Sequence, residues 1–140
     1  VALGSDGACG NNRISVLEEM RMVSLLQKAH TLDALCVNYE QAFEMGTAAG
    51  GRALGLPVGE IAPGCYADFF GVDLGDLSMQ PLSASMEQLL PNIVYSMQPS
   101  AIQNVVVNGR QVYSSGDFLT IKKSRVLLKI KDTMEHLQSA

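Results

Sequence analysis

The spacing of apolar residues divides the chain into an N-terminal part with helical periodicity and a C-terminal part with the pattern of short strands. After Ser15, apolar residues recur every three or four positions, which predicts an amphipathic helix that ends near His30. Ser15 and Glu18 have the spacing of a capping box, and Glu18 and Arg21 are placed to pair on the outer face of this helix. Residues 1–4 form a short apolar run, which we interpret as the end of a buried strand that must pair with strands not present in this chain.

A second helix is predicted after Asn38, which repeats the cap spacing with Gln41 in a weaker form. Gly55 is a natural C-terminal stop for this helix. Its small residues mark a face that can approach a neighbouring element closely: Ala42, Met45, Ala49 and Ala53.

Beyond residue 56, glycine and proline separate short strand-like pieces, and Asn108-Gly109 is the strongest hairpin signal in the chain. The expected elements are a strand within residues 66–73, a short helix around 86–90, a strand over 101–107, its return over 110–113 and an amphipathic helix over 124–138. The pattern predicts a mixed α/β fold in which the last helix packs on a small sheet.

Composition narrows the class of protein. The chain is 47% hydrophobic and 17% charged, as expected of a globular domain, but its 140 residues are fewer than the roughly 250 of a complete (β/α)₈ barrel. It contains no apolar run near the ~20 residues of a membrane span and no signal-peptide pattern. Its start at Val1 instead of Met suggests a processed product, a partial gene or a cloned fragment. Three widely spaced cysteines argue against a disulfide framework, so we expect a cytoplasmic location.

The distribution of charge is uneven. The net charge of −4 argues against a nucleic-acid partner. Residues 122–140 contain five basic and two acidic residues, or +3, which leaves −7 on the rest of the chain. A basic helix on an acidic body can dock on that body or on a partner, or it can simply present a solvated face.

The sharpest chemical feature is Asp6, at the tip of the predicted strand and between two glycines. In parallel α/β proteins, sites are built at this end of the strands. A carboxylate there can bind a metal ion and take a proton from metal-bound water. It can equally cap the following turn or helix.

The residues around Asp6 resemble a known family. Residues 1–13 (VALGSDGACGNNR) and 17–29 are similar to the last barrel strand and following helix of the amidohydrolase superfamily. Within it the match is to the S-adenosylhomocysteine/5′-methylthioadenosine deaminases and the triazine chlorohydrolases and aminohydrolases. Further similar stretches follow in the same order, at residues 42–56, 59–73 and 105–113.

The resemblance implies an α/β fold made of three segments. These are the last strand and helices of a TIM barrel over residues 1–56, part of an accessory β-domain over 57–120, and a C-terminal helix over 121–140.

The resemblance also implies a function. It indicates a metal-dependent hydrolase of non-peptide C–N bonds that deaminates an aminopurine or a similar heterocycle. It assigns Asp6 as a ligand of one divalent metal, zinc or iron, and as the proton shuttle. The histidines and the catalytic glutamate of the family have no counterpart here, so we expect the chain alone to be inactive, and it need not bind the metal itself. His30 and His136 are not expected to be ligands.

Two alternatives stay open. Asn11 can contact the substrate, or it can brace the loop that carries Asp6. The chain can also be a catalytically incomplete structural module that self-associates, and in either case we expect a homo-oligomer with a small heterocyclic ligand and no membrane partner.

Overall fold

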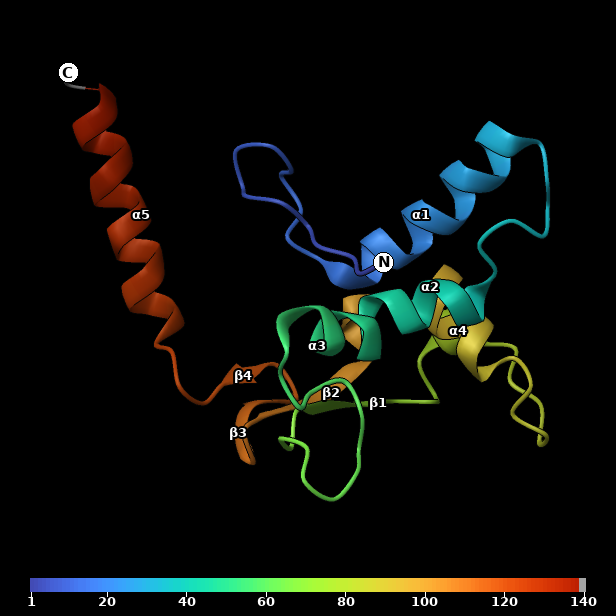
Figure 1. Ribbon diagram of the computed structural model, residues 1–140. Helices are drawn as coiled ribbons and strands as arrows, with labels where there is room; N and C mark the ends of the chain where they lie inside the picture. The colour runs from blue at the N-terminus through green and yellow to red at the C-terminus, as the bar shows by residue number, and fades with distance from the viewer. Residues whose placement is uncertain (139–140) are drawn as a thin grey trace.

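The computed structural model describes residues 1–138 of the chain, which form a helical layer, a small antiparallel sheet and a separate C-terminal helix (Figure 1). The elements in order are α1 (Val16–Thr31), α2 (Tyr39–Gly46), α3 (Ala48–Leu54), β1 (Phe69–Val72), the 3₁₀ helix η1 (Leu77–Met79), α4 (Leu89–Tyr95), the 3₁₀ helix η2 (Pro99–Ala101), β2 (Ile102–Val107), β3 (Arg110–Ser114), β4 (Asp117–Phe118) and α5 (Lys123–Gln138). Among these residues no helix is both long and apolar enough to cross a membrane.

The caps of the first two helices follow from local hydrogen bonds. The Ser15 hydroxyl accepts from the backbone N–H of Glu18 at 3.3 Å, which satisfies one of the free donors at the start of α1. At α2 the capping box is complete, because Asn38 accepts from the Gln41 N–H and the Gln41 side chain accepts from the Asn38 N–H. Gly55, with a φ of 66°, ends α3 as predicted, but the single helix predicted after Asn38 is divided at Thr47 into α2 and α3.

Two clusters of buried side chains hold the helices and the sheet together. The first joins α1, α2 and α4 through Met20, Ala42 and Val94, and the second consists of Met79, Met97 and Ala101. Leu17 packs against both clusters, so α1 connects the helical layer to the segment that leads into the sheet.

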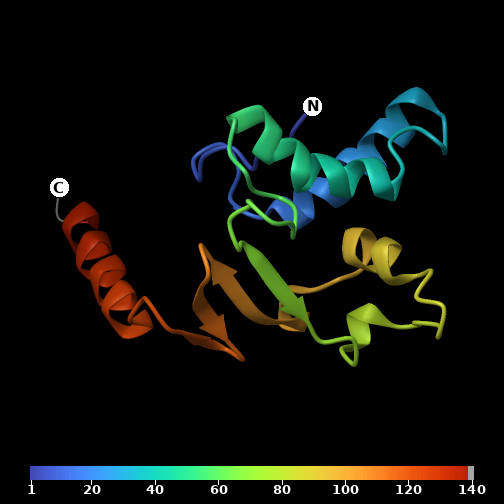
Figure 2. The same ribbon diagram turned by 60° about the horizontal axis from the view of Figure 1, so that its bottom comes forward.

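The sheet has the strand order β1-β2-β3-β4, with every pair antiparallel. Its central hairpin turns at Asn108 and Gly109, whose φ angles of 49° and 74° are those of a type I′ turn. The predicted hairpin is therefore confirmed. Figure 2 shows α1, α2 and α3 on one side of the sheet.

Several predictions about the elements are wrong. Residues 1–4 are not a strand. Leu3 packs against the first core cluster and donates its N–H to the Met45 carbonyl at 3.0 Å, while Val1 is exposed. The apolar run is real, but a strand needs a paired neighbour, and the described residues offer this segment none.

The predicted helix at 86–90 lies instead at Leu89–Tyr95. Pro91 stands in the first turn of this helix, where its missing N–H costs nothing. Met86 adopts a positive φ of 60° in the preceding turn.

The C-terminal helix forms where it was predicted, but it does not pack on the sheet. None of its residues is buried, and both views show it standing apart from the rest of the chain (Figures 1 and 2). The amphipathic pattern predicted an apolar face that packs against another surface, but it carries no information about which surface that is.

Candidate functional site

Asp6 lies in an exposed turn that precedes α1. Its backbone has a φ of 58°, a conformation that aspartate tolerates better than most residues. The carboxylate Oδ1 accepts a hydrogen bond from the Gly7 N–H at 2.6 Å. Oδ2 lies beside Gly10, where a Cβ would come within 2.8 Å of it. The absence of a side chain at Gly10 therefore leaves room for this carboxylate, whereas a Cβ on Gly7 would meet nothing within 4 Å.

Asp6 does not cap α1. That position belongs to Ser15, and the Asp6 side chain is accessible to solvent. Of the two uses considered for this carboxylate, capping of the next helix is therefore wrong, although it does brace its own turn through Gly7.

Asn11 braces the loop. Its amide Nδ2 donates to the Glu19 carboxylate at 2.7 Å, and its Oδ1 accepts from the Arg13 N–H at 3.1 Å. Gly10 and Asn11 also donate their N–H groups to the Gly7 carbonyl at 3.0 and 2.9 Å. The segment after Asp6 is thereby folded into a compact turn tied to the first turn of α1.

The predicted pairing on the first turn of α1 involves a different arginine. Glu18 pairs with Arg13, with Nε and Oε2 2.6 Å apart, and not with Arg21. The contact is an ion pair without hydrogen-bond geometry. Because Glu18 turns toward Arg13, its side chain does not reach back to the N-cap, and only the Ser15 half of the predicted capping box is present.

The described residues alone do not form a metal site. Within residues 1–138, no group of three or more His, Cys, Asp or Glu side chains lies close enough together to hold an ion. A zinc site takes at least three protein ligands, and Asp6 stands apart from the two histidines, since His30 lies in the last turn of α1 and His136 in α5. The three cysteines are free thiols.

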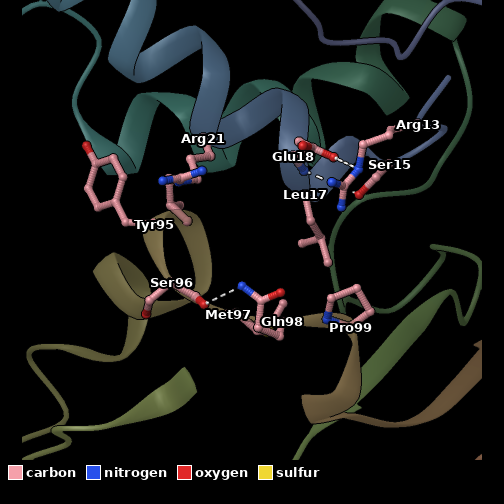
Figure 3. A pocket seen from close by; sticks show the side chains of 11 residues that line it. Arg13, Ser15, Leu17, Glu18, Arg21, Tyr95, Ser96, Met97, Gln98 and Pro99 are labelled. Atoms are coloured by element: carbon pink, nitrogen blue, oxygen red, sulfur yellow. Dashed lines mark hydrogen bonds and ion pairs between the residues drawn. The ribbon is translucent and has the colours of Figure 1, made fainter. Parts of the chain in front are cut away.

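A pocket of about 260 Å³ lies between the start of α1 and the chain around residues 94–99 (Figure 3). Arg13, Glu18 and Arg21 line one wall, and Gln98 and Pro99 line the opposite one. Asp6 is not part of its lining. The pocket is polar, but it is separate from the carboxylate that the sequence singled out.

A polar cluster that the sequence did not reveal connects α1 with α4. Lys28 donates from Nζ to the Ser24 hydroxyl at 2.9 Å and to the Tyr95 hydroxyl at 2.8 Å. Ser24, which is fully buried, donates to the Val37 carbonyl at 2.7 Å. Burial raises the pKa of the Tyr95 hydroxyl, but its hydrogen bonds with Lys28 and Ser24 and the Lys28 charge outweigh this effect and lower that pKa below its usual value.

The helical spacing of Ser24 and Lys28 is visible in the sequence. Tyr95, however, lies 71 residues from Ser24, and no local pattern links them. Only the packing of α4 against α1 brings the three side chains together.

Comparisons with known proteins identify the family of the chain. Residues 1–112 match the amidohydrolase family. A 5-methylthioadenosine/S-adenosylhomocysteine deaminase of Syntrophomonas wolfei is 38% identical over 139 residues, which cover 98% of this chain and 31% of the relative. The deaminase of the same name from Pyrococcus horikoshii is 37% identical over 129 residues, or 92% of this chain and 30% of the relative.

Solved structures agree in fold. The crystal structure of a zinc-bound adenosine deaminase from Xanthomonas campestris matches with a TM-score of 0.90 and 25% identity, over 99% of this chain and 31% of that one. A zinc-bound atrazine chlorohydrolase from Arthrobacter aurescens matches with a TM-score of 0.75 and 16% identity, over 90% of this chain and 28% of that one, which is a likeness of fold alone. The chain thus spans a little under a third of the length of these proteins.

Proposed function

This chain belongs to the amidohydrolase family, and from that membership we propose that it supplies the Asp6 loop to a metal-dependent hydrolase that deaminates an aminopurine nucleoside or a similar heterocycle. The observation that carries the proposal is the match to deaminases of 37–38% identity over more than nine-tenths of the chain. The exposed Asp6 carboxylate, which caps no helix, is consistent with it.

The role proposed for Asp6 is to hold and move a proton. In such an enzyme a bound divalent metal, zinc by analogy with the solved relatives, would supply an activated water at neutral pH. Asp6 would accept the proton that this water releases at a carboxylate oxygen and would donate it to the departing amine. Oδ2 is the oxygen suited to this, because Oδ1 is engaged by the Gly7 N–H.

The remaining ligands are proposed to come from polypeptide that the longer relatives have. The described residues provide one candidate carboxylate and no cluster that could hold the ion. We therefore propose that the chain by itself neither holds a stoichiometric metal ion nor turns over substrate.

Asn11 is assigned to the loop and not to the substrate. Both ends of its side chain amide are already engaged, by Glu19 and by the Arg13 N–H. Its contribution is to fix the turn that presents Asp6.

A fusion tests the proposal. The purified chain is assayed for bound zinc and for ammonia release from 5′-methylthioadenosine and adenosine, and neither is expected. The chain is then fused to the part of the Syntrophomonas wolfei deaminase that precedes the matched region. We expect the fusion to bind zinc and deaminate, and the fusion with Asp6→Asn to lose activity by about 10²–10⁴-fold.

Two results contradict the proposal. Stoichiometric zinc with turnover in the isolated chain would show that the site is complete without further polypeptide. An Asp6→Asn fusion as active as its parent would remove the role given to this carboxylate.

A further inference from the structure

The C-terminal helix presents an apolar stripe to solvent. Leu127, Ile130, Met134 and Leu137 follow one another at spacings of three, four and three residues, which places them on one face of α5. These four side chains are 50–69% exposed. Most of the stability of a helix in a protein comes from packing of such a face, so a 16-residue helix of this kind needs a surface to cover it.

Charge decides between two ways of covering the stripe with a second copy of the chain. Residues 122–140 carry +3 and the rest carries −7. Two α5 helices packed on each other would bring +3 against +3, which is repulsive. An α5 helix packed on the body of another copy brings opposite charges together.

The body offers an apolar groove with acidic residues. This groove, of about 460 Å³, lies between α2, the segment 58–61 and β1, and Phe43, Ile61 and Phe69 contribute to its lining. Glu60 and Asp68 also line it, and the lining contains no lysine or arginine. Ile61 is 88% exposed and Phe69 is 43% exposed, so large apolar side chains here are in contact with water.

A second apolar hollow is a weaker candidate. It lies on the sheet and is lined by Pro99, Ile102, Val105, Val112, Tyr113, Phe118, Thr120 and Ile121. None of these side chains is charged, so it has no electrostatic preference for a basic helix.

The groove and the helix lie at opposite edges of the sheet. The groove includes β1, the first strand in the order β1-β2-β3-β4, whereas α5 follows β4 at the other edge (Figures 1 and 2). In the structure they do not meet within one copy. Two copies placed side by side can each receive the helix of the other, which gives a closed two-fold dimer.

We propose that α5 of one copy docks its apolar stripe in the groove between α2 and β1 of a second copy, and that the exchange is reciprocal. A 16-residue helix is about 24 Å long and about 10 Å wide, so two such contacts bury on the order of 1,000 Å². This area is at the lower limit for a specific interface and corresponds to a reversible dimer. Asp6 does not line the groove, so dimerisation and deamination are tested by separate experiments.

Analytical ultracentrifugation of the full chain, from about 1 to about 200 µM, tests the exchange. The helix variant is Ile130→Gln with Met134→Gln, and the groove variant is Ile61→Gln. The control is Leu128→Gln, a leucine of α5 that is 61% exposed and lies off the stripe. Circular dichroism of each variant checks that the helices are kept.

We expect the chain and its Leu128→Gln control to dimerise, with dissociation constants that rise in high salt. Both other variants should dimerise at least about tenfold more weakly. A mixture of the helix and groove variants should regain part of the affinity, because one intact helix–groove pair remains in each mixed dimer.

Three outcomes overturn the proposal. A chain that is monomeric at every concentration would exclude the exchange. That result would instead favour a contact of α5 with the body of its own copy. A groove variant that dimerises normally while the helix variant does not would show that α5 pairs with α5. A Leu128→Gln control as weak as the helix variant would show that the stripe is not the contact.

Discussion

The Lys28 ammonium group lies 2.8 Å from the Tyr95 hydroxyl, and this contact joins α1 to α4 across the first core cluster. Nζ is also 5.2 Å from the centroid of the Tyr95 ring. The same hydroxyl is 2.8 Å from the buried Ser24 hydroxyl. Either of these two hydroxyls can be the donor in this contact.

Replacement of Tyr95 by Phe should lower the free energy of unfolding by about 1 kcal/mol, because it removes a hydrogen bond to a buried hydroxyl and the acceptor of Lys28. Urea unfolding of the two proteins at neutral pH measures the difference. Ser24→Ala should cost more, about 1–3 kcal/mol, because it leaves the Val37 carbonyl without its donor. Equal stability of all three proteins would mean that the cluster contributes nothing.

The stability that the Tyr95 cluster contributes to the folded chain should also depend on pH. The pKa of Tyr95 is lowered from 10.0 in the folded chain, so the folded state releases this proton before the unfolded state does. The stabilisation is fully present above pH 10.0, and it is lost as the pH falls through the folded pKa of Tyr95. The difference in unfolding free energy between the native chain and Tyr95→Phe should therefore grow from pH 7 toward pH 10. A difference that shrinks over this range would contradict the assignment.

Gly46 and Gly50 make a matched pair for a packing test. A Cβ on Gly46 would lie 2.6 Å from both Cγ and Sδ of Met20, which is 2% exposed and has little room to move. Gly46→Ala should therefore destabilise the chain by about 1–3 kcal/mol. A Cβ on Gly50 meets nothing within 4 Å, so Gly50→Ala should stabilise α3 by about 0.5–1 kcal/mol. Thermal unfolding that shifts both variants in one direction would contradict this packing.

The elements that the sequence predicted well are those whose cause is local. The caps at Ser15 and Asn38 and the turn at Asn108-Gly109 depend on hydrogen bonds and φ angles within a few residues, and the structure has all three. The strand predicted at residues 1–4 is not formed, because a strand needs a paired neighbour and the described residues offer none. The packing of α5 on the sheet was predicted wrongly for a related reason. An amphipathic pattern identifies the apolar face of a helix but not the surface on which that face packs.

In the candidate site, too, the local features could be predicted from the sequence and the long-range contacts could not. Asp6 and the Asn11 brace lie within one loop, and glycine spacing pointed to this loop. The pocket in Figure 3 combines Arg13 and Arg21 with Gln98, and the polar cluster combines Lys28 with Tyr95. Both depend on how α1 meets the segment around α4, which no local pattern encodes.

Asp76 should make the stability of the second cluster sensitive to acid. Its carboxylate accepts from the Ser78 hydroxyl at 2.6 Å, the Ser78 N–H at 2.8 Å and the Ser100 hydroxyl at 3.2 Å, and thereby ties η1 to η2. The hydrogen bonds of Ser78 lower the pKa of Asp76 from 3.8, although burial opposes them. This contribution is present above pH 3.8 and is lost as the pH falls through the folded pKa.

Chemical unfolding of the native chain and of Asp76→Asn at pH 7 and at about pH 3 tests this linkage. We expect the native chain to be the more stable at pH 7 and its advantage to decrease in acid. An advantage that is unchanged at the lower pH would show that the ionised carboxylate is not what ties the two 3₁₀ helices.

Asp6→Asn should separate chemistry from folding. The Asp6 side chain is exposed, asparagine tolerates the φ of 58°, and an amide oxygen can still accept from the Gly7 N–H. The unfolding free energy of the isolated chain should thus change by less than about 0.5 kcal/mol. Asp6→Ala is the poorer probe, because alanine at a positive φ adds strain of about 1 kcal/mol and loses the hydrogen bond to Gly7.

Asp33→Asn provides the control for the removal of one negative charge. In the native chain the Asp33 carboxylate accepts from the Leu35 N–H at 2.9 Å in the loop after α1. The substitution therefore changes the same functional group in a comparable turn. In the fusion protein, Asp33→Asn should keep its turnover while Asp6→Asn loses it at equal stability. Equal losses in both variants would mean that net charge is what matters, and a loss of stability in Asp6→Asn would mean that this carboxylate holds the loop and does not move a proton.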